Sequence, residues 1–173
     1  MTAVGQVKRA VAAAIKAVGC AAIESYSEEQ LKRYATAVAA VGTKETVIEE
    51  SGAAQYLGEK VDEATQETVS VYGRKMLLTL LIEVYAPRTL GAAGCEKAAE
   101  AVTQALMTAL PEGLKLGSLQ WGKTGWDKVT GMFRLRASAA YEAYFLCEMA
   151  EDETVFTDFV LKGTVKEREQ YDP

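Results

Sequence analysis

The stretch Met132–Cys147, MFRLRASAAYEAYFLC, alternates apolar and mostly polar side chains along its length. Successive side chains of a strand point to opposite faces, so this period of two predicts a β-strand with one buried and one wetter face. The apolar set is Phe133, Leu135, Ala137, Ala139, Tyr141, Ala143, Phe145 and Cys147; the other set is Arg134, Arg136, Ser138, Glu142 and Tyr144. Sixteen residues is long for a strand, which usually has about 5–6. We therefore expect it to span a large sheet or to project toward a partner.

Two segments have the apolar spacing of amphipathic helices. In Val4–Val18 the apolar residues recur at helical spacing, and Gly19 is a suitable stop. Ala92–Leu110 is the clearest helix, with one apolar stripe, and Pro111 follows it. Ser27–Gln30 fits a capping box, although the helix that it would start has little room.

Several further segments have strand character. Gly73–Ala86 has apolar residues at its even positions and is followed by Pro87, which cannot donate to a sheet ladder. The other expected strands are Ala35–Ile48 (long or broken), Leu114–Trp121 and Thr154–Thr164, and Cys20–Ile23 is a short strand or a connection. Between them we expect a turn or short strand at Gly52–Gly58, a polar loop or disordered excursion at Glu59–Glu67, and a glycine-rich connection at Gly122–Gly131.

This order of elements predicts the fold class. Two helices that each hide one stripe, beside half-buried strands, indicate a two-layer α+β domain, with an antiparallel or mixed sheet and two helices packed on one face. The chain of 173 residues, 49% apolar and 25% charged, fits one domain at 1–165 followed by a charged C-terminal tail at 166–173.

Composition narrows the function classes. A net charge of −5 argues against a sequence-independent nucleic-acid binder, but it is compatible with a channel through which DNA slides. The three cysteines are far apart and form no CxxC pair, so we expect a reducing compartment and neither a disulfide framework nor a zinc site. No signal peptide and no membrane span is expected.

The residues do not form a recognisable catalytic set. With no histidine, the chain lacks the commonest general base and the usual activator of a nucleophile, so we expect no enzyme, no cofactor and no metal site. Glu83 and Glu142 fall on strand faces opposite the core stripes. We expect them to form salt bridges across the sheet with Arg134, Arg136 or Lys75.

One sequence motif favours a different class of protein, a nucleotide-binding protein. Gly117–Thr124, GSLQWGKT, matches the phosphate-binding loop G-x-x-x-x-G-K-[ST], which works only where a helix begins at its Lys-Thr pair. Gly125–Gly131 cannot start a stable helix, so the preferred interpretation is a hairpin connection with exposed Lys123 and Lys128. A small nucleotide-binding protein remains the alternative from another class.

The same loop contains both tryptophans of the chain. We expect Trp121 to anchor the hairpin against the core. The role of Trp126 is open, since an exposed tryptophan is a candidate partner contact.

Taken together, the elements resemble a family. The order of helix, strands and long loop, then GRKMLLTLLIEVYAP (73–87), a helix and GLKLGSLQWGKTGWDKVTGMFRLRASAAYEAYF (113–145), resembles tail terminators and tail-completion proteins of tailed bacteriophages and phage-tail-like bacteriocins. The segment D-x-x-x-G-M-F-R (Asp127–Arg134), which opens the long alternating strand, is the most specific part. The resemblance covers about Val4 to Val165.

The resemblance implies a structural protein of a virion tail or phage-tail-like particle, assembled in the bacterial cytoplasm. Such proteins form a ring, typically a hexamer, that caps the tail tube, ends its polymerisation and docks the head or collar. The implied partners are further copies of the chain, the tail tube protein, and the sheath and head or collar proteins, with DNA only as passing cargo and no membrane. Another neck or tail component, such as a tube initiator or head-completion protein, is the alternative within this class.

By this analogy, the loops Tyr56–Val69 and Trp121–Gly131 face the tube and the sheath. The candidate oligomer and partner contacts are Arg134, Arg136, Glu142, Trp126, Lys123 and Lys128.

Overall fold

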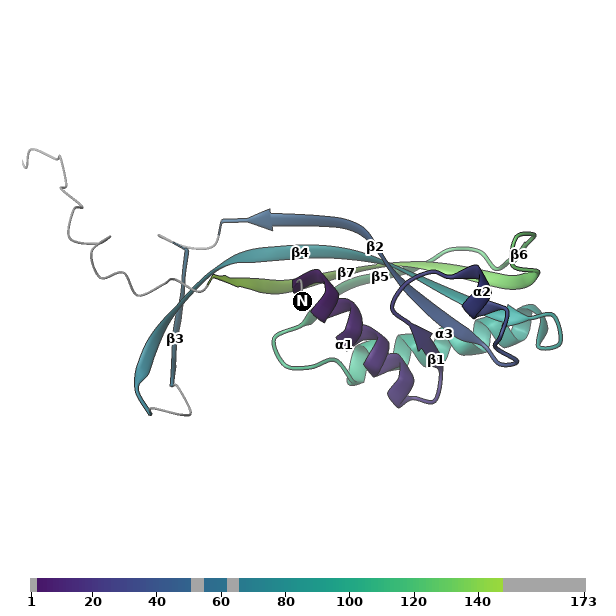
Figure 1. The fold of residues 1–173 in the computed structure, drawn as a ribbon, viewed down its shortest axis with the longest axis horizontal. Helices are drawn as coiled ribbons and strands as arrows, with labels where there is room; N and C mark the ends of the chain where they lie inside the picture. Colours follow the sequence, from purple (N-terminus) through teal and green to yellow (C-terminus); the bar gives the residue numbers. More distant parts are fainter. Residues whose placement is uncertain (1–2, 51–54, 62–65, 148–173) are drawn as a thin grey trace, which may run out of the picture.

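The chain folds around one mixed β-sheet. The computed structural model describes residues 3–50, 55–61 and 66–147 (Figure 1). In that part a seven-stranded sheet has the order β1-β2-β4-β7-β5, with β3 paired to β4 and β6 paired to β7. The strands are β1 (Ala21–Ile23), β2 (Val38–Glu49), β3 (Tyr56–Val61), β4 (Thr68–Pro87), β5 (Lys115–Trp121), β6 (Gly125–Asp127) and β7 (Met132–Cys147). Among the strands of the described residues, only β1 and β2 pair in parallel. The α+β class and the mixed sheet are confirmed.

The strand predicted at Met132–Cys147 forms with those bounds as β7. It pairs with β4 along its whole length, from Met132 opposite Pro87 to Cys147 opposite Tyr72. β4 begins at Thr68, earlier than the predicted Gly73, and ends at Pro87, one residue after the predicted Ala86. These two strands form the centre of the sheet.

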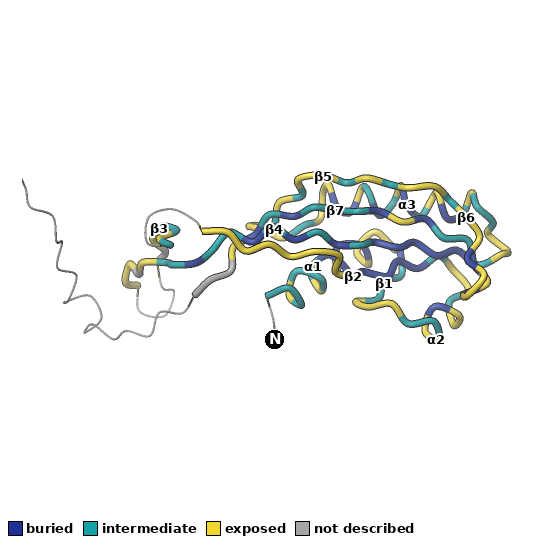
Figure 2. The backbone as a smooth tube through the Cα atoms, turned by 90° about the horizontal axis from the view of Figure 1, so that it is seen from above, coloured by how far each residue is buried: buried dark blue, intermediate teal, exposed yellow. Residues whose placement is uncertain are grey.

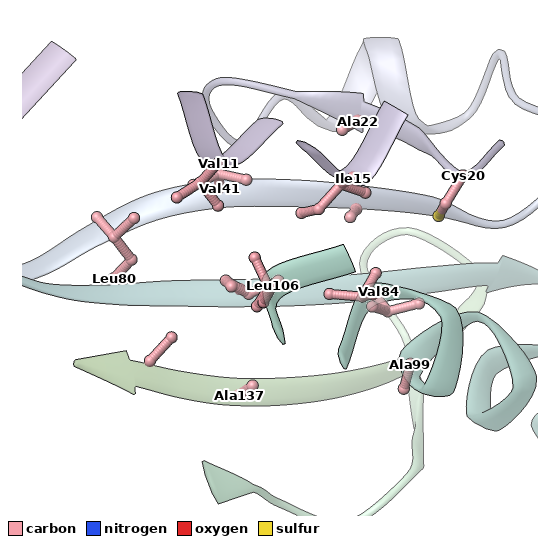
Figure 3. Close-up of a cluster of buried hydrophobic side chains, with 14 of the residues drawn as sticks. Val11, Ile15, Cys20, Ala22, Val41, Leu80, Val84, Ala99, Leu106 and Ala137 are labelled. Atoms are coloured by element: carbon pink, nitrogen blue, oxygen red, sulfur yellow. The ribbon is translucent and has the colours of Figure 1, made fainter. Parts of the chain in front are cut away.

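Helices α1 (Ala3–Ala17) and α3 (Gly91–Thr108) pack with the sheet around one core. Alternate residues of β4, from Leu78 to Ala86, meet Val11 and Ile15 of α1 and Val102 and Leu106 of α3 in this cluster (Figure 3). Leu135, Ala137, Ala139 and Tyr141 of β7 complete it, as their alternation predicts.

A second, smaller core lies on the opposite side of the sheet. The helix α2 (Glu28–Leu31) is capped by Ser27, whose hydroxyl accepts from the backbone N–H of Gln30, as the capping box predicts. Leu31 is buried with Val38, Ala40, Tyr85 and Met132. Since Tyr85 alternates with the core residues of β4, this cluster covers the other face.

The second core changes the pattern at the start of β2. The prediction placed a strand from Ala35, but β2 begins at Val38. Val38–Val41 are all buried because α1 covers one face and α2 the other, so the period-two pattern that marks a half-buried strand is lost there.

Two predicted loops contain strands. β3 (Tyr56–Val61) begins in Gly52–Gly58, where a turn or short strand was expected, and continues into the expected excursion Glu59–Glu67; it pairs with residues 68–72 of β4. The polar composition of Glu59–Glu67 was therefore misleading at its first residues. Gly122–Gly131 likewise contains β6, which pairs with Met132–Arg134. The strand expected at Thr154–Thr164 and the tail at 166–173 lie outside the described residues.

The sheet is longer than the helical layer. In Figure 1 the ends of β2, β4 and β7 continue past α1 and α3, and β3 lies at the far end of β4. Figure 2 shows the same extension from above. We call β3 with the adjoining ends Val47–Glu49, Thr68–Met76 and Ala143–Cys147 the arm.

Candidate interaction site

The sheet face turned away from α1 and α3 carries two of the expected contact residues, Arg136 and Glu142. Residues opposite each other in antiparallel strands share a face, so the register places Glu83 beside Arg136 and Leu77 beside Glu142. We call this the open face; its members are Glu45, Val47, Lys75, Leu77, Thr79, Leu81, Glu83, Lys115, Ser118, Gln120, Arg136, Ser138, Ala140 and Glu142.

The Arg136 side chain is held by Glu83. Its Nε donates to Oε1 of Glu83 across the β4–β7 pair, and this ion pair was predicted. Glu83 is only 7% exposed, whereas Arg136 is an exposed residue. The hydrogen bond with Glu83 raises the pKa of the Arg136 guanidinium. Arg136 therefore neutralises an otherwise buried carboxylate, and its outer side stays open to a partner.

The predicted pair between Glu142 and Lys75 is also present. Lys75 Nζ lies 3.0 Å from Glu142 Oε2, and about a third of each side chain is exposed. The hydrogen bond to Glu142 raises the pKa of Lys75. An exposed pair of this kind adds little stability, so it organises charge on the face more than it holds the fold.

Between these charges the open face has a shallow apolar hollow of about 300 Å³. Leu77, Thr79 and Ala140 lie at its floor, and Glu45 and Glu142 belong to its lining. Leu77 is half-buried, and no described helix covers it. Tyr85, on the same face of β4, is instead covered by α2. This strip is the apolar part of the open face.

A second group of expected contacts lies at the opposite end of β7, around the β6–β7 turn. Asp127 accepts from the Thr130 hydroxyl at 2.7 Å and lies 3.6 Å from Arg134. Burial disfavours the charge of Asp127, but the Thr130 hydrogen bond and the Arg134 charge outweigh it, so its pKa is below the usual value. The turn closes at Gly131, whose φ of 67° favours glycine.

The loop residues divide between core and surface. Trp121 is half-buried against the main core and donates its Nε1–H to Thr103 at 2.9 Å, so the expected anchor is confirmed. Trp126 is 46% exposed and packs edge-to-face on Phe133, with ring centroids 5.1 Å apart. Lys123 and Lys128 are exposed, as expected.

The six expected contacts are therefore not one site. Arg136 and Glu142 lie on the open face. Arg134, Trp126, Lys123 and Lys128 lie at or near the β6–β7 turn, at the end of the sheet remote from the arm (Figure 1).

The segment Gly117–Thr124, which matches the phosphate-loop motif, does not fold as a phosphate-binding loop. Gly117–Trp121 belong to β5, and the segment after Lys123 and Thr124 enters β6 rather than a helix. The Thr124 hydroxyl donates instead to Glu96 of α3 at 3.1 Å. The helix N-terminus through which a phosphate-binding loop holds phosphate is therefore lacking at Lys123 and Thr124, as the preferred interpretation of the motif expected.

Cys20 and Cys95 are buried, and burial raises the pKa of both thiols, that of Cys95 to about 11. They are small core residues in this structure, as expected. Among the described residues no three His, Cys, Asp or Glu side chains gather as a metal site. No helix in the described ranges is long and apolar enough to cross a membrane.

The sequence prediction gave Tyr56–Val69 as a contact loop by analogy but named no contact residue in the arm, and it did not include the strand ends beside β3. Its exposed apolar side chains include Tyr56, Val61, Val47 and Ile48, and Tyr56 packs against Tyr72. A β-branched run in an exposed strand was the available signal at Val47–Ile48, because such residues are otherwise expected to be covered.

The comparisons with known proteins add no relative. No family model matches this chain, and no curated protein sequence matches it.

Proposed function

We propose that the chain is a structural protein of a phage tail or phage-tail-like particle, a terminator that forms a ring on the end of the tail tube. The observation that supports the proposal is that the sheet extends beyond the helices packed on it. β4 has 20 residues and β7 has 16, and both continue into the arm (Figure 1). Strands in globular proteins usually have about 5–6 residues.

In this proposal the arm contacts the tube protein. It combines exposed strand backbone with exposed Tyr56, Val61 and Ile48, which offer area for packing and for strand pairing. The β6–β7 turn, with Trp126, Lys123 and Lys128, faces the sheath or the head and collar at the other end of the subunit.

The open face is assigned to the lumen. Two of the three basic side chains on this face, Arg136 and Lys75, are each paired with a carboxylate, so the face offers passing DNA few uncompensated positive charges. Since phosphate binding depends on unpaired Lys and Arg, such a wall would let DNA slide.

The test is to locate the chain along a particle. The protein is co-expressed with its tube protein, and tubes are imaged by negative stain with a label on this chain. We expect labelled rings at one tube end and tubes of limited length. Unlimited tubes without end label, or label along the tube or at the opposite end, would contradict a terminator.

The arm provides a matched test. Val61→Lys places a charge on a residue that is 57% exposed, so folding should be unchanged while tube capping is lost. The control is Val129→Lys, which alters a 60% exposed residue at the opposite end and should leave capping intact.

A further inference from the structure

One long edge of the sheet is open. β5 is the last strand on its side, and within the described ranges it pairs only with β7 (Figure 2). Past the start of β5, the same side of β7 from Ala143 to Cys147 has no described neighbour either. An unpaired edge presents a row of backbone N–H and C=O groups, which proteins usually cover or interrupt. The outer side of β5 therefore has room for one further strand.

The helical layer beside this edge exposes an apolar side chain. Met107 is 73% exposed, more than any other large hydrophobic side chain of the described residues. It lies one turn after Thr103 on α3, and the Thr103 hydroxyl accepts from Trp121 of β5. Met107 thus belongs to the α3 stripe that borders β5. A strand beyond β5 would have this apolar neighbour on its helix side.

The charge of the chain is unevenly distributed. Residues 148–173 contain eight of the 24 acidic residues and three of the 19 basic ones, so they account for the whole net charge of −5. Residues 1–147 are neutral by the same count. Four of the six residues Glu148–Glu153 are acidic, directly after the end of β7. A surface that receives this part of the chain should therefore be basic.

The two open edges of the sheet differ in charge. At the start of β5, Lys115 is exposed and has no ion pair among the described residues, because Glu142 opposite it is bound by Lys75. The other open edge, the outer side of β2 past its contact with β1, carries the exposed Glu45 and Glu49, which have no ion pair in the described ranges either. Charge therefore favours the β5 edge as the neighbour of Glu148–Glu153.

We propose that residues 154–164 of the same chain, TVFTDFVLKGT, form a further strand along the outer side of β5, and that Glu148–Glu153 connect it to β7. The occupant of the edge is thus the chain's own C-terminal segment. A chain covered in this way does not offer β5 to other copies, which prevents aggregation at this edge. The contact concerns the chain by itself and does not depend on the proposed function.

The length of the connection fits. Lys115 is level with Glu142, five residues before the end of β7, and the outer side of β5 is two strand spacings from β7. The two ends of the connection are therefore roughly 20 Å apart. The seven steps from Cys147 to Thr154 span up to roughly 23–25 Å. The segment then runs back antiparallel to β7, and hence parallel to β5.

The register then pairs apolar side chains. With Thr154 level with Lys115, and with the bulge next to Gly117 taken into account, Val155 is level with Leu116 and Phe159 is level with Trp121. Leu116 and Trp121 pack against the main core. The odd-numbered residues of the segment therefore share the covered face, on the side of α3.

The alternation of the segment fits its two sides. The odd-numbered residues carry no charge, whereas Asp158 and Lys162 fall on the open face. The uncharged side therefore meets Met107. The opposite alternation would bring Asp158 to the α3 stripe beside β5, where Glu96 and Glu100 are exposed and would repel it. The uncharged set is Val155, Thr157, Phe159, Leu161 and Gly163.

The test is disulfide trapping between Ser118→Cys and Phe156→Cys in the full chain, which also carries Cys147→Ser so that this thiol does not compete. In the proposed register both residues are level with Ala140 on neighbouring strands, within disulfide range. Oxidation should therefore give a cross-linked monomer, identified by its mass and by its migration on a non-reducing gel. A covalent dimer as the main product would mean that copies exchange the segment, and it would overturn the contact within one chain.

The matched control is Val47→Cys with Phe156→Cys, at the other open edge. Val47 is 40% exposed and is linked to the same segment, so this pair measures collision of two tethered thiols without docking. We expect the pair with Ser118→Cys to oxidise roughly tenfold faster. Ser118→Cys with Asp158→Cys, two residues out of register, should also be slower. Equal rates at the two edges, or no cross-link to position 118, contradict the proposal.

Hydrogen exchange tests the same edge without cysteines. If the segment pairs with β5, the amides of Lys115–Trp121 that point away from β7 are protected. Phe159→Asp puts a charge on the covered side of the segment, so exchange within these residues should become roughly tenfold faster. Tyr171→Asp makes the same change after the segment and should alter exchange less than about twofold. Unchanged exchange in Phe159→Asp would overturn the pairing.

Charge reversal tests the choice of edge. Lys115→Glu should slow the cross-link between positions 118 and 156 roughly threefold, because the acidic connection then lies beside a carboxylate. Lys44→Glu, on β2, is the control and should leave the rate unchanged. Equal slowing by both substitutions would show a long-range charge effect and would contradict docking beside Lys115.

These measurements use the chain alone, without tube protein, which separates them from the test of the proposed function. A trapped segment in a chain that never caps tubes keeps the contact and removes only the terminator role. Labelled rings at tube ends from a chain that gives no cross-link at position 118 do the reverse.

Discussion

The two faces of the central sheet are made by the same strands and have different physical roles. On the covered face, Leu80, Ile82 and Val84 are fully buried beneath α1 and α3. On the open face, the alternating residues Leu77, Thr79 and Leu81 are only half-buried and lie among ion pairs. The main core thus lies on the covered face, whereas Leu77, Thr79 and Leu81 on the open face add less buried area.

The largest expected effect tests this division directly. Leu80→Ala removes a side chain that is 0% exposed, and we expect a loss of about 3 kcal/mol in the free energy of unfolding from lost burial and a cavity. Leu77→Ala, on the open face of the same strand, should cost less than about 1 kcal/mol. Urea unfolding of both variants measures the difference, and similar losses would show that the open face is part of the core.

The two ion pairs of the open face sharpen the comparison. Arg136→Met leaves Glu83 without its partner at a 7% exposed position, so we expect about 1–2 kcal/mol of destabilisation. Lys75→Met breaks the half-exposed pair with Glu142 and should cost about 0–0.5 kcal/mol.

The double variant Arg136→Met with Glu83→Gln is the control for the first pair. It also removes the unpaired charge of Glu83, so part of the lost stability, measured by thermal unfolding, should be recovered. If the single and double variants unfold alike, Glu83 is not dependent on Arg136.

The covered face was predictable because its residues follow short-range hydrophobic patterns in the sequence. The alternation in Met132–Cys147 predicted which residues of β7 enter the core, and the stripe in Ala92–Leu110 predicted α3. The salt bridges of Glu83 and Glu142 followed from the same alternation.

The arm and the second core were not predictable in this way. β3 is short, and its apolar residues Tyr56, Leu57 and Val61 do not alternate with polar ones, so it offers no hydrophobic period to detect. The cover that α2 gives to Val38 and Ala40 depends on Leu31, a contact that only the folded chain creates. The division of the six expected contacts between two ends likewise depends on strand register.

The β6–β7 turn gives a smaller, pH-dependent effect. The pKa of Asp127 is lowered in the folded chain, so its stabilising contribution is present above its unfolded pKa near 3.8 and is lost as pH falls through the lower folded value. Asp127→Asn should therefore destabilise the protein near pH 7 by about 1 kcal/mol and leave stability near pH 2–3 almost unchanged. Thermal unfolding at several pH values checks this, and an equal loss at all pH values would contradict a charge effect.

The smallest expected effect concerns the covered face and has the opposite sign. Tyr141 is 2% exposed, and its hydroxyl has no hydrogen-bond partner among the described residues, while burial raises its pKa strongly. Removing an unsatisfied buried hydroxyl without changing the ring should be neutral or stabilising, so we expect Tyr141→Phe to gain about 0–1 kcal/mol in the free energy of unfolding. Tyr26→Phe, at a 47% exposed position, is the matched control and should change little.

A loss of stability in Tyr141→Phe would mean that the hydroxyl finds a partner beyond the described ranges. Because Tyr141 stands where β7 leaves the helical layer for the arm, that partner would then belong to the boundary between the two regions. In that case buried contacts of the covered face would continue past α1 and α3. The arm would then be stabilised by a side-chain contact of Tyr141 as well as by strand pairing.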